Sequence, residues 1–396
     1  MRIKHMFEIL AKWEVGKVMK TFTLDDRFDE IMNTEPIGRS IGNLFPSCWT
    51  ARITSEYAHY TMRQIQKKVT MEWGAPFFAD AFVECANILM YTFLEKRFRF
   101  VPLWNEQETD WIPHADLNDA ESVFLFTGNP KVDNIAFAHT SGSGSIPPYP
   151  TNAVPEEKRK MEFNRPAVIL CPGGGYEMLS SYTEGVLLAQ RMERDGGYKA
   201  FVLNYRIRPN TYPLPQMDLA MAVMHIRRYA KEYGIDPQKI LVIGASAGGH
   251  LCASEAFLHR DLKDEILIML PKCKKEPYQT IMACPDKIGL LYPVVSFLTE
   301  YHEGSWQSLT NGKEALREKL SVEQHITPDY PITYAFANQD DGCVPASNTL
   351  RLEESLKKAG VMHLCEIYPS GDHGVALGYD HSCREWSEHM LAFFEK

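Results

Sequence analysis

The sequence predicts an α/β fold, in which helices flank a mostly parallel sheet, preceded by a helical N-terminal extension. From about residue 121 onward, short apolar runs alternate with helical stretches, a pattern typical of parallel strands joined by crossover helices. The first 112 residues instead show helical periodicity and few strand-like runs. With 396 residues, of which 45% are hydrophobic and 23% charged, the chain can bury a sizeable core.

The charge balance excludes a basic protein that binds nucleic acid or a membrane surface. Lys and Arg number 42 against 51 Asp and Glu, which gives a net charge of −9. This balance offers no footprint for nucleic acid or anionic lipid, so we expect small, weakly charged partners. The nine cysteines are scattered and contain no C-x-x-C pair, which predicts reduced thiols and neither a disulfide framework nor a metal site.

The N-terminal sequence does not resemble a secretion signal. Glu8, Lys12, Glu14 and Lys17 interrupt the apolar stretch that a signal peptide needs. The most apolar window, residues 76–93, contains two carboxylates and an asparagine and is therefore a poor membrane span. We expect a cytoplasmic protein.

Residues 1–112 form the predicted extension. They hold five of the seven tryptophans, and apolar side chains recur every three or four positions between Phe78 and Phe93. So many exposed aromatic side chains would form an aggregating patch, so the extension must be buried against a partner. We expect it to pack against the rest of the chain near the carboxyl end of the sheet and to narrow the substrate pocket. Self-association into a homo-oligomer through the same surface is the alternative.

Seven apolar runs in the second region are predicted strands. They are separated by helical stretches such as 183–195, 217–233 and 347–359. The predicted strands are 123–126, 167–170, 200–203, 240–243, 288–292, 332–336 and 365–368. The stretch 141–150 is rich in Gly, Ser and Pro and is a loop by composition.

The strongest functional signal is the segment Gly-Ala-Ser-Ala-Gly at 244–248. This G-x-S-x-G pattern follows the predicted strand 240–243 directly and precedes a helix-capable stretch. Small neighbours suit a sharp strand-to-helix turn that lifts the Ser246 hydroxyl out of the sheet. In this context the pattern predicts a nucleophilic serine, whereas alone it would indicate a glycine-rich turn. We expect His250, four residues further on, to pack inside the following helix.

A second signal is the segment Cys-Pro-Gly-Gly-Gly-Tyr at 171–176, which follows the predicted strand 167–170. Consecutive glycines let backbone N–H groups turn toward a site without interference from a Cβ atom. Acyl transfer needs such donors, because its tetrahedral intermediate carries negative charge on the former carbonyl oxygen. A flexible loop is the alternative. Phosphate binding is less favoured, because no lysine follows at P-loop spacing.

A nucleophilic serine needs a base, and the base needs a carboxylate that orients it. After a G-x-S-x-G turn these residues follow in the order Asp or Glu, then His. The predicted strand 332–336 leads to Asp340 and Asp341, and the strand 365–368 leads to His373 between small residues. His373 is therefore the best candidate base, and either aspartate fits the acid. No H-E-x-x-H pattern occurs, so nothing predicts zinc hydrolysis.

Together these motifs resemble α/β-hydrolases of the acetyl-xylan/feruloyl esterase-like branch, often labelled xylanase- or lipase-related hydrolases. The resemblance spans roughly residues 160–396. It rests on motifs in the family's order: CPGGGY at 171–176, YR at 205–206, YGIDP at 233–237, GASAGGH at 244–250, YPVVS at 292–296, SVE at 321–323, the D-x-x-V-P at 341–345 and GDHG at 371–374. It implies an α/β-hydrolase catalytic domain over residues 116–396.

The resemblance assigns a role to each residue of a catalytic triad. It implies Ser246 as the nucleophile, His373 as the base and Asp341 as the acid. The family's acid lies three residues before the valine of the Val-Pro pair, which selects Asp341 over Asp340.

The resemblance also implies an oxyanion hole. The donors would be the backbone N–H of Ala247 with those of Gly174 and Gly175. The loop begins Cys-Pro where many related esterases have His-Gly, which leaves open which glycine of 173–175 donates. The resemblance implies no metal and no organic cofactor.

We therefore expect a serine esterase that hydrolyses small acyl esters, with acetyl favoured, on small-molecule or oligosaccharide substrates through an acyl-enzyme. An amide-type hydrolase with the same triad, such as an arylformamidase or an oligopeptidase-like enzyme, is one alternative. A hydrolase fold kept as a non-catalytic binding module is the other. The intact Ser, Asp and His argue against the module, because binding alone needs none of them.

Overall fold

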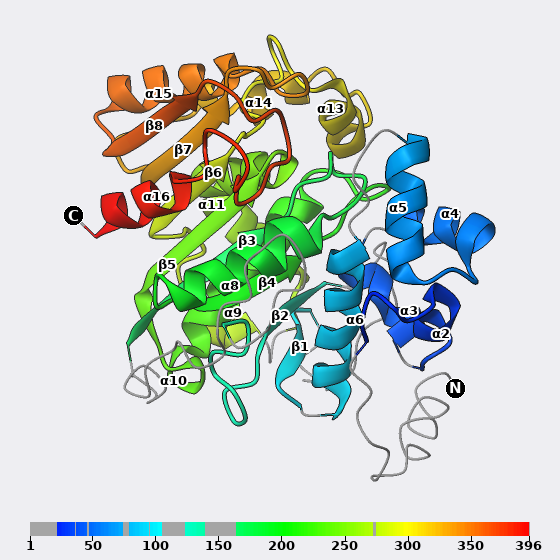
Figure 1. Ribbon diagram of the computed structural model, residues 1–396. Coiled ribbons are helices and arrows are strands. Elements are labelled where there is room, and N and C mark those ends of the chain that lie inside the picture. The colour runs from blue at the N-terminus through cyan, green and yellow to red at the C-terminus, as the bar shows by residue number, and fades with distance from the viewer. Residues whose placement is uncertain are drawn as a thin grey trace.

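The computed structural model describes residues 22–35, 37–45, 47–73, 79–94, 96–104, 123–138, 164–271 and 275–395. Over these residues the chain forms an eight-stranded sheet with helices on both faces (Figure 1). The predicted loop at 141–150, and the expected boundary between residues 112 and 116, lie outside the described residues.

The sheet has the strand order β1-β2-β4-β3-β5-β6-β7-β8. Its first two pairs, β1 with β2 and β2 with β4, are antiparallel, and the other pairs are parallel. The strands are β1 (Phe98–Pro102), β2 (Phe124–Gly128), β3 (Arg165–Cys171), β4 (Lys199–Asn204), β5 (Ile235–Ala245), β6 (Lys287–Leu291), β7 (Ile332–Asn338) and β8 (His363–Tyr368). The mostly parallel sheet confirms the predicted fold class, and all seven predicted strands lie in it.

Strand β1 corrects the expected division of the chain. It lies within residues 1–112, where we expected helices, yet it forms the edge of the sheet beside β2. Phe98 and Phe100 alternate along β1, and both stack on Phe126, with ring centroids 5.0 and 4.6 Å apart. This period-2 pattern spans only five residues, too short to stand out beside a long helical stretch. The sheet therefore begins at residue 98, before the expected start at 116.

The helices surround this sheet. The predicted helices at 183–195, 217–233 and 347–359 correspond to η3 with α8, α9 with α10, and α15. The helices are α2 (Phe28–Met32), α3 (Ile37–Ser40), η1 (Ile41–Asn43), α4 (Ser47–Tyr57), α5 (Met62–Trp73), α6 (Ala79–Leu94), the π-helical η3 (Ser181–Val186), α8 (Leu187–Arg194), α9 (Leu214–Arg228), α10 (Ala230–Tyr233), α11 (Ala247–Met269), η4 (Glu276–Tyr278), α13 (Glu303–Thr310), α14 (Leu316–Leu320), η5 (Val322–Gln324), α15 (Ser347–Ala359) and α16 (Trp386–Phe394).

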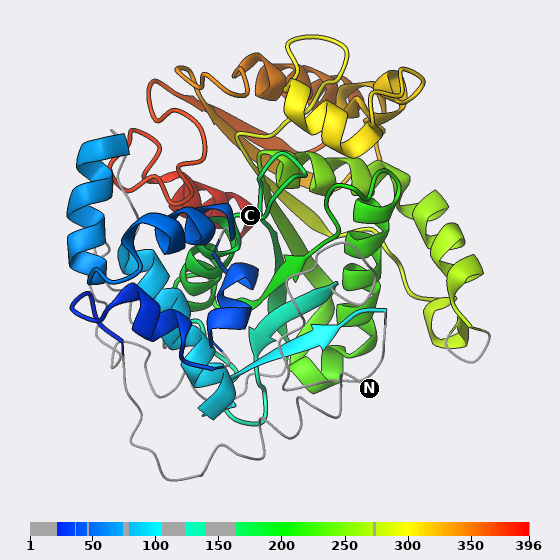
Figure 2. The ribbon, with the colours of Figure 1, turned by 90° about the vertical axis from the view of Figure 1, so that its right-hand side faces the viewer.

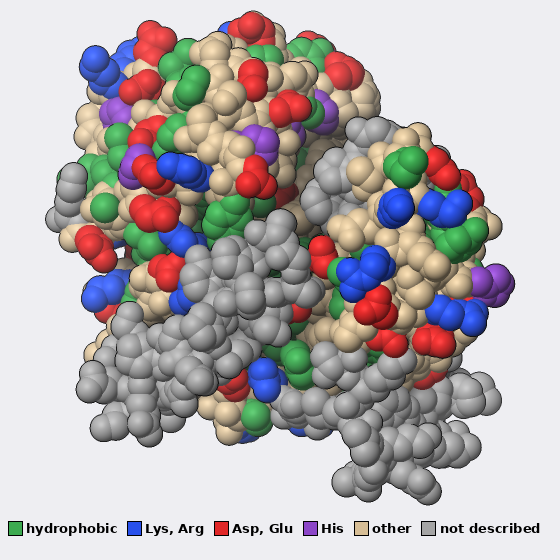
Figure 3. Space-filling view, viewed as in Figure 1, with side chains coloured by type: hydrophobic (Ala, Val, Ile, Leu, Met, Phe, Trp, Pro, Cys, Tyr) green, Lys and Arg blue, Asp and Glu red, His purple; other side chains and the backbone are tan. Residues whose placement is uncertain are grey.

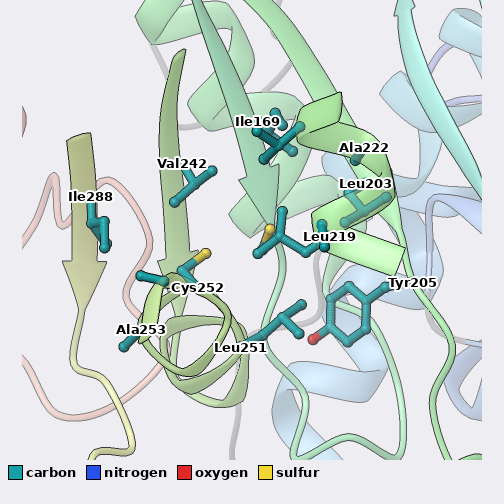
Figure 4. Packing of buried hydrophobic residues seen from close by; sticks show 14 of the residues in the cluster. Ile169, Leu203, Tyr205, Leu219, Ala222, Val242, Leu251, Cys252, Ala253 and Ile288 are labelled. Atoms are coloured by element: carbon teal, nitrogen blue, oxygen red, sulfur yellow. The ribbon is translucent and has the colours of Figure 1, made fainter. Parts of the chain in front are cut away.

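Two hydrophobic cores lie on the two faces of the sheet, because side chains alternate along each strand. On one face Ile169 and Val242 pack with Leu219 of α9 and Leu251 of α11 (Figure 4). On the other face Leu170 packs into a core that α8, α16 and the N-terminal helices share. The sheet is thus covered on both sides, as its parallel strands require.

The described N-terminal helices belong to the second core. Phe82 of α6 is fully buried and contacts the rings of Phe28 and Phe45, with centroids 5.1 and 5.3 Å apart. The same cluster contains Val168 and Leu170 of β3. Figure 2 shows these helices, in blue, gathered on one side of the sheet. They therefore pack against the rest of the chain, while their effect on a substrate pocket stays a prediction.

The surface carries mixed charge. Acidic and basic side chains are interspersed over the described residues on the face shown in Figure 3. In the part of the chain that the structure describes, no helix is both long enough and apolar enough to cross a membrane.

Candidate active site

Ser246 occupies a sharp turn between β5 and α11. Its backbone has φ 54° and ψ −119°, a strained conformation of the kind that clusters at functional sites. A Cβ atom on Gly244 would lie 2.1 Å from the Gly248 carbonyl oxygen, and one on Gly248 would lie 2.0 Å from the Cys171 carbonyl oxygen. Both positions therefore require glycine, which explains the spacing of the motif.

His373 lies between the serine and an aspartate. Its Nε2 is 2.8 Å from Ser246 Oγ, and its Nδ1 is 2.7 Å from Asp341 Oδ2. The other oxygen of Asp341 accepts the backbone N–H groups of Cys343 and Val344, at 2.9 and 2.8 Å. These bonds fix a carboxylate whose side chain has no exposed surface. When Nδ1 carries the ring proton, Nε2 is free to accept the serine hydroxyl. The three residues singled out from the sequence are thus brought together.

Asp340 has a different environment from its neighbour. Its Oδ1 accepts the backbone N–H groups of Gly371 and Asp372, both at 2.9 Å. These two hydrogen bonds, above all the one from Asp372, lower the pKa of Asp340. Asp340 therefore holds the loop that carries His373, whereas Asp341 contacts the histidine ring itself.

The glycine loop runs directly beside the serine. A Cβ atom on Gly173 would lie 2.9 Å from Ser246 Cβ. The N–H of Gly173 already donates to Glu184 Oε2, at 2.7 Å. Within the described residues, the N–H groups of Gly174 and Gly175 have no acceptor. The structure thus removes Gly173 from the three candidate oxyanion donors and leaves the other two.

Ala247 offers a further N–H group at the same place. It is the first residue of α11, so its N–H has no partner within the helix. The helix N-terminus also carries partial positive charge, which favours a developing anion. A helix terminus and a glycine loop therefore meet at Ser246.

Glu184 is a component of the site that no sequence pattern singled out. This glutamate is buried, and its Oε1 accepts the hydroxyl of Tyr292 at 2.8 Å. Burial raises the pKa of Glu184, while its hydrogen bonds with Tyr292 and Gly173 and the charge of His373 lower it. A glutamate in a helical stretch is ordinarily exposed, so no sequence signal distinguished this one.

His250 packs within α11, as expected, and contacts Tyr176 at the end of the glycine loop. It is fully buried; its Nδ1 lies 2.8 Å from the hydroxyl of Tyr176 and its Nε2 lies 2.8 Å from the Leu320 carbonyl oxygen. Burial lowers the pKa of His250 to about 4, so the ring is neutral near pH 7. It therefore donates to Leu320, accepts from Tyr176 and anchors the end of the loop.

His302 is another residue near the site that the sequence did not single out. It precedes α13, and its Nδ1 accepts the Ser305 N–H at 3.1 Å. A Cβ atom on Gly175 would lie 3.7 Å from His302 Cε1, which places the ring over the glycine loop. Burial and the nearby charge of His373 lower the pKa of His302. Among the described residues, no group of three or more His, Cys, Asp or Glu side chains could hold a metal ion.

Comparison with known proteins gives a consistent set of relatives. Residues 154–356, just over half of the chain, match the BD-FAE family. Endo-1,4-beta-xylanase B from Butyrivibrio fibrisolvens is 30% identical over 233 residues, which cover 57% of this chain and 35% of that protein. Acetylxylan esterase from Xylanibacter ruminicola is 31% identical over 223 residues, covering 54% of this chain and 41% of that protein. The chain thus spans less than half the length of both relatives.

One solved structure is similar over a larger part of the chain. It is the acetyl ester-xyloside bifunctional hydrolase from Caldicellulosiruptor lactoaceticus, with 30% identity and a TM-score of 0.56. The match covers 75% of this chain and 95% of that one. The similarity therefore extends beyond the residues that match the family.

Proposed function

The chain belongs to the BD-FAE family, and from this premise we propose that it is a serine carboxylic ester hydrolase. The observation that carries the proposal is the pair of hydrogen bonds made by His373. Its Nε2 lies 2.8 Å from Ser246 Oγ, and its Nδ1 lies 2.7 Å from Asp341 Oδ2. The three residues supply a nucleophile, a base and a carboxylate that orients the base.

In the first step Ser246 Oγ attacks the carbonyl carbon of the ester. His373 Nε2 takes the hydroxyl proton, and the carboxylate of Asp341 stabilises the imidazolium that forms. The tetrahedral intermediate then collapses: the bond to the alcohol oxygen breaks, and that oxygen receives the proton from Nε2. The acyl group stays on Ser246 as an ester.

The negative charge of the intermediate lies on the former carbonyl oxygen. We expect the N–H groups of Ala247 and of Gly174 or Gly175 to stabilise it, because none of them donates to an acceptor within the described residues. A loop fixed before the substrate binds needs no reorganisation during the reaction, and this preorganisation lowers the barrier.

In the second step water hydrolyses the acyl-enzyme. The water oxygen attacks the acyl carbon while His373 Nε2 takes a proton from the water. The histidine then gives that proton to Ser246 Oγ as the bond between Oγ and the acyl carbon breaks and the carboxylic acid leaves. Both steps use side chains and backbone groups of this chain.

The proposed substrates are acetyl esters of carbohydrates. Two relatives support this choice by name, the acetylxylan esterase and the acetyl ester-xyloside hydrolase. A cytoplasmic location, expected from the sequence, stays a prediction.

The test combines a covalent probe with a substrate panel. A fluorophosphonate should label the full-length chain at Ser246, located by peptide mass spectrometry, and Ser246→Ala should abolish the label. Among acetylated xylo-oligosaccharides, 4-nitrophenyl esters of increasing acyl length, N-formylkynurenine and peptides, we expect the acetyl esters to be hydrolysed fastest. Faster hydrolysis of N-formylkynurenine or peptides would establish an amide-type hydrolase instead, and a folded protein without label or turnover would point to a binding module.

A further inference from the structure

The buried carboxylate of Glu184 connects the glycine loop at 173–175 with the loop that carries His373, and both loops lie beside Ser246. Only 4% of the residue is exposed. Its Oε2 accepts the N–H of Gly173 at 2.7 Å. The next two residues, Gly174 and Gly175, have N–H groups without an acceptor in the described part of the chain. Its Oε1 accepts the hydroxyl of Tyr292 at 2.8 Å. One side chain therefore contacts both the glycine loop and the residue that follows β6.

Tyr292 extends this connection to the loop of His373. Its hydroxyl oxygen accepts the N–H of Ala376, three residues after the histidine, at 3.0 Å. Its ring packs edge-on against the imidazole, with centroids 4.9 Å apart and planes inclined by 64°. Glu184 thus restrains one loop directly and the other through Tyr292.

The hydrogen bonds of Glu184 favour its ionised form, whereas burial, the largest effect, raises its pKa above the ordinary value. The backbone N–H of Gly173 can only donate. The Tyr292 hydroxyl accepts from Ala376 and donates to Glu184. Donors to both oxygens of a carboxyl group favour its charged form. Among the described residues, the titratable groups that interact with it include Tyr292, His373 and Tyr205, and the first two lower the pKa of Glu184 against the effect of burial.

We propose that Glu184 is a positioning residue for hydrolysis, which aims the N–H groups after Gly173 at the oxyanion and fixes His373 through Tyr292. Its negative charge also lies close enough to favour the imidazolium that forms during the reaction. The proposal rests on the proposed function. It extends that function beyond the triad to a second carboxylate, which acts through Gly173 and Tyr292.

The decisive variant is Glu184→Gln, which keeps the shape of the side chain and removes its charge. In the full-length enzyme with 4-nitrophenyl acetate, we expect kcat to fall about tenfold or more, on the scale of one misplaced catalytic group. KM should change less than about threefold, because the lost contact acts in the transition state.

Glu193 provides the matched control. It is also a buried glutamate, 5% exposed, whose two oxygens accept backbone N–H groups, from Ala138 at 3.2 Å and Ala200 at 3.3 Å. It belongs to α8 and contacts the beginning of β4, the end of the strand opposite to its carboxyl end. Glu193→Gln should lower the melting temperature but leave kcat per folded molecule unchanged.

Different results would overturn the positioning role of Glu184 and the proposed ester hydrolase function. If Glu184→Gln is folded and its kcat is within threefold of that of the parent, the positioning role is wrong. If it does not fold, Tyr292→Phe takes its place, because it removes the hydroxyl and keeps the ring; unchanged turnover in that variant overturns the proposal. A parent chain that hydrolyses no ester and takes no label at Ser246 overturns the proposed function instead.

Discussion

Asp340 and Asp341 are neighbours in the chain, yet their carboxylates bind different parts of the loop that carries His373. Asp341 Oδ2 lies 2.7 Å from the histidine Nδ1, whereas Asp340 Oδ1 lies 2.9 Å from the backbone nitrogens of Gly371 and Asp372. The first carboxylate can therefore act on the charge and tautomer of the ring. The second can act only on where the loop lies.

This difference predicts unequal effects of matched substitutions. Asp341→Asn should lower kcat by about 10⁴, because an amide no longer stabilises the productive tautomer and the imidazolium. Asp340→Asn should cost far less, because its amide oxygen can still accept both backbone N–H groups. Initial rates with 4-nitrophenyl acetate, normalised to folded protein, measure both. The reverse ranking would mean that the triad is misassigned.

Replacement of the nucleophile should remove activity without lowering stability. Ser246→Ala should abolish turnover and leave the melting temperature close to that of the parent, because its hydroxyl contributes little to the core. The double variant with His373→Ala should be scarcely less active than either single variant, because the two residues act as a unit. Turnover of Ser246→Ala within tenfold of the parent would contradict the assignment.

The triad could be predicted from the sequence because its motifs are local. Ser246, Asp341 and His373 each follow a predicted strand, and the carboxyl ends of parallel strands meet at one edge of a sheet. Glu184 could not be found in this way. Its contacts with Gly173 and Tyr292 cross 11 and 108 residues, and nothing local indicates that its helix turns the carboxylate inward.

The sequence could not show which glycine of 173–175 donates to the oxyanion, because this also depends on a contact between distant residues. A run of three glycines suggests an oxyanion hole, but only the position of Glu184 shows that the N–H of Gly173 already has an acceptor.

Strand β1 could not be predicted for a different reason. Its aromatic alternation is real but short, and its partner β2 begins at Phe124, more than 20 residues after β1 ends at Pro102.

The N-terminal helices should be needed for a stable fold. Phe82→Ala should lower the free energy of unfolding by about 3–5 kcal/mol, because it opens a cavity among fully buried rings. Met71→Ala on α5 is the control, since that side chain is 76% exposed, and it should cost less than about 0.5 kcal/mol. Urea unfolding measures both. Equal midpoints for the two variants would show that these helices do not share the core of the sheet.

Removal of the whole extension should have a larger effect. A chain that begins at residue 96 would expose the face of β3 that carries Val168 and Leu170, both fully buried here. We expect this fragment to aggregate, since large exposed apolar patches promote association. A soluble, monomeric fragment with the acyl preference of the full-length chain would exclude both packing and pocket-narrowing roles for residues 1–95.

Glu84 on α6 should make the protein less stable as the pH rises. It is 2% exposed, its Oε1 has no hydrogen-bond partner within the described residues, and burial raises its pKa from 4.5 to about 8. Between these values the folded chain retains a proton that the unfolded chain releases. Because the unfolded state binds fewer protons, the free energy of unfolding falls with rising pH, by at most about 1.4 kcal/mol per unit.

Glu84→Gln removes this titration while keeping the shape of the side chain. Its melting temperature should match that of the parent most closely near pH 5 and exceed it by a growing margin up to pH 8, since only the parent must ionise a buried carboxyl. Other groups titrate in both proteins and cancel in the difference. Glu265→Gln, at an exposed position on α11, is the control and should give a difference that does not change with pH. A flat difference for Glu84→Gln as well would mean that water or another group solvates this carboxylate in the folded protein.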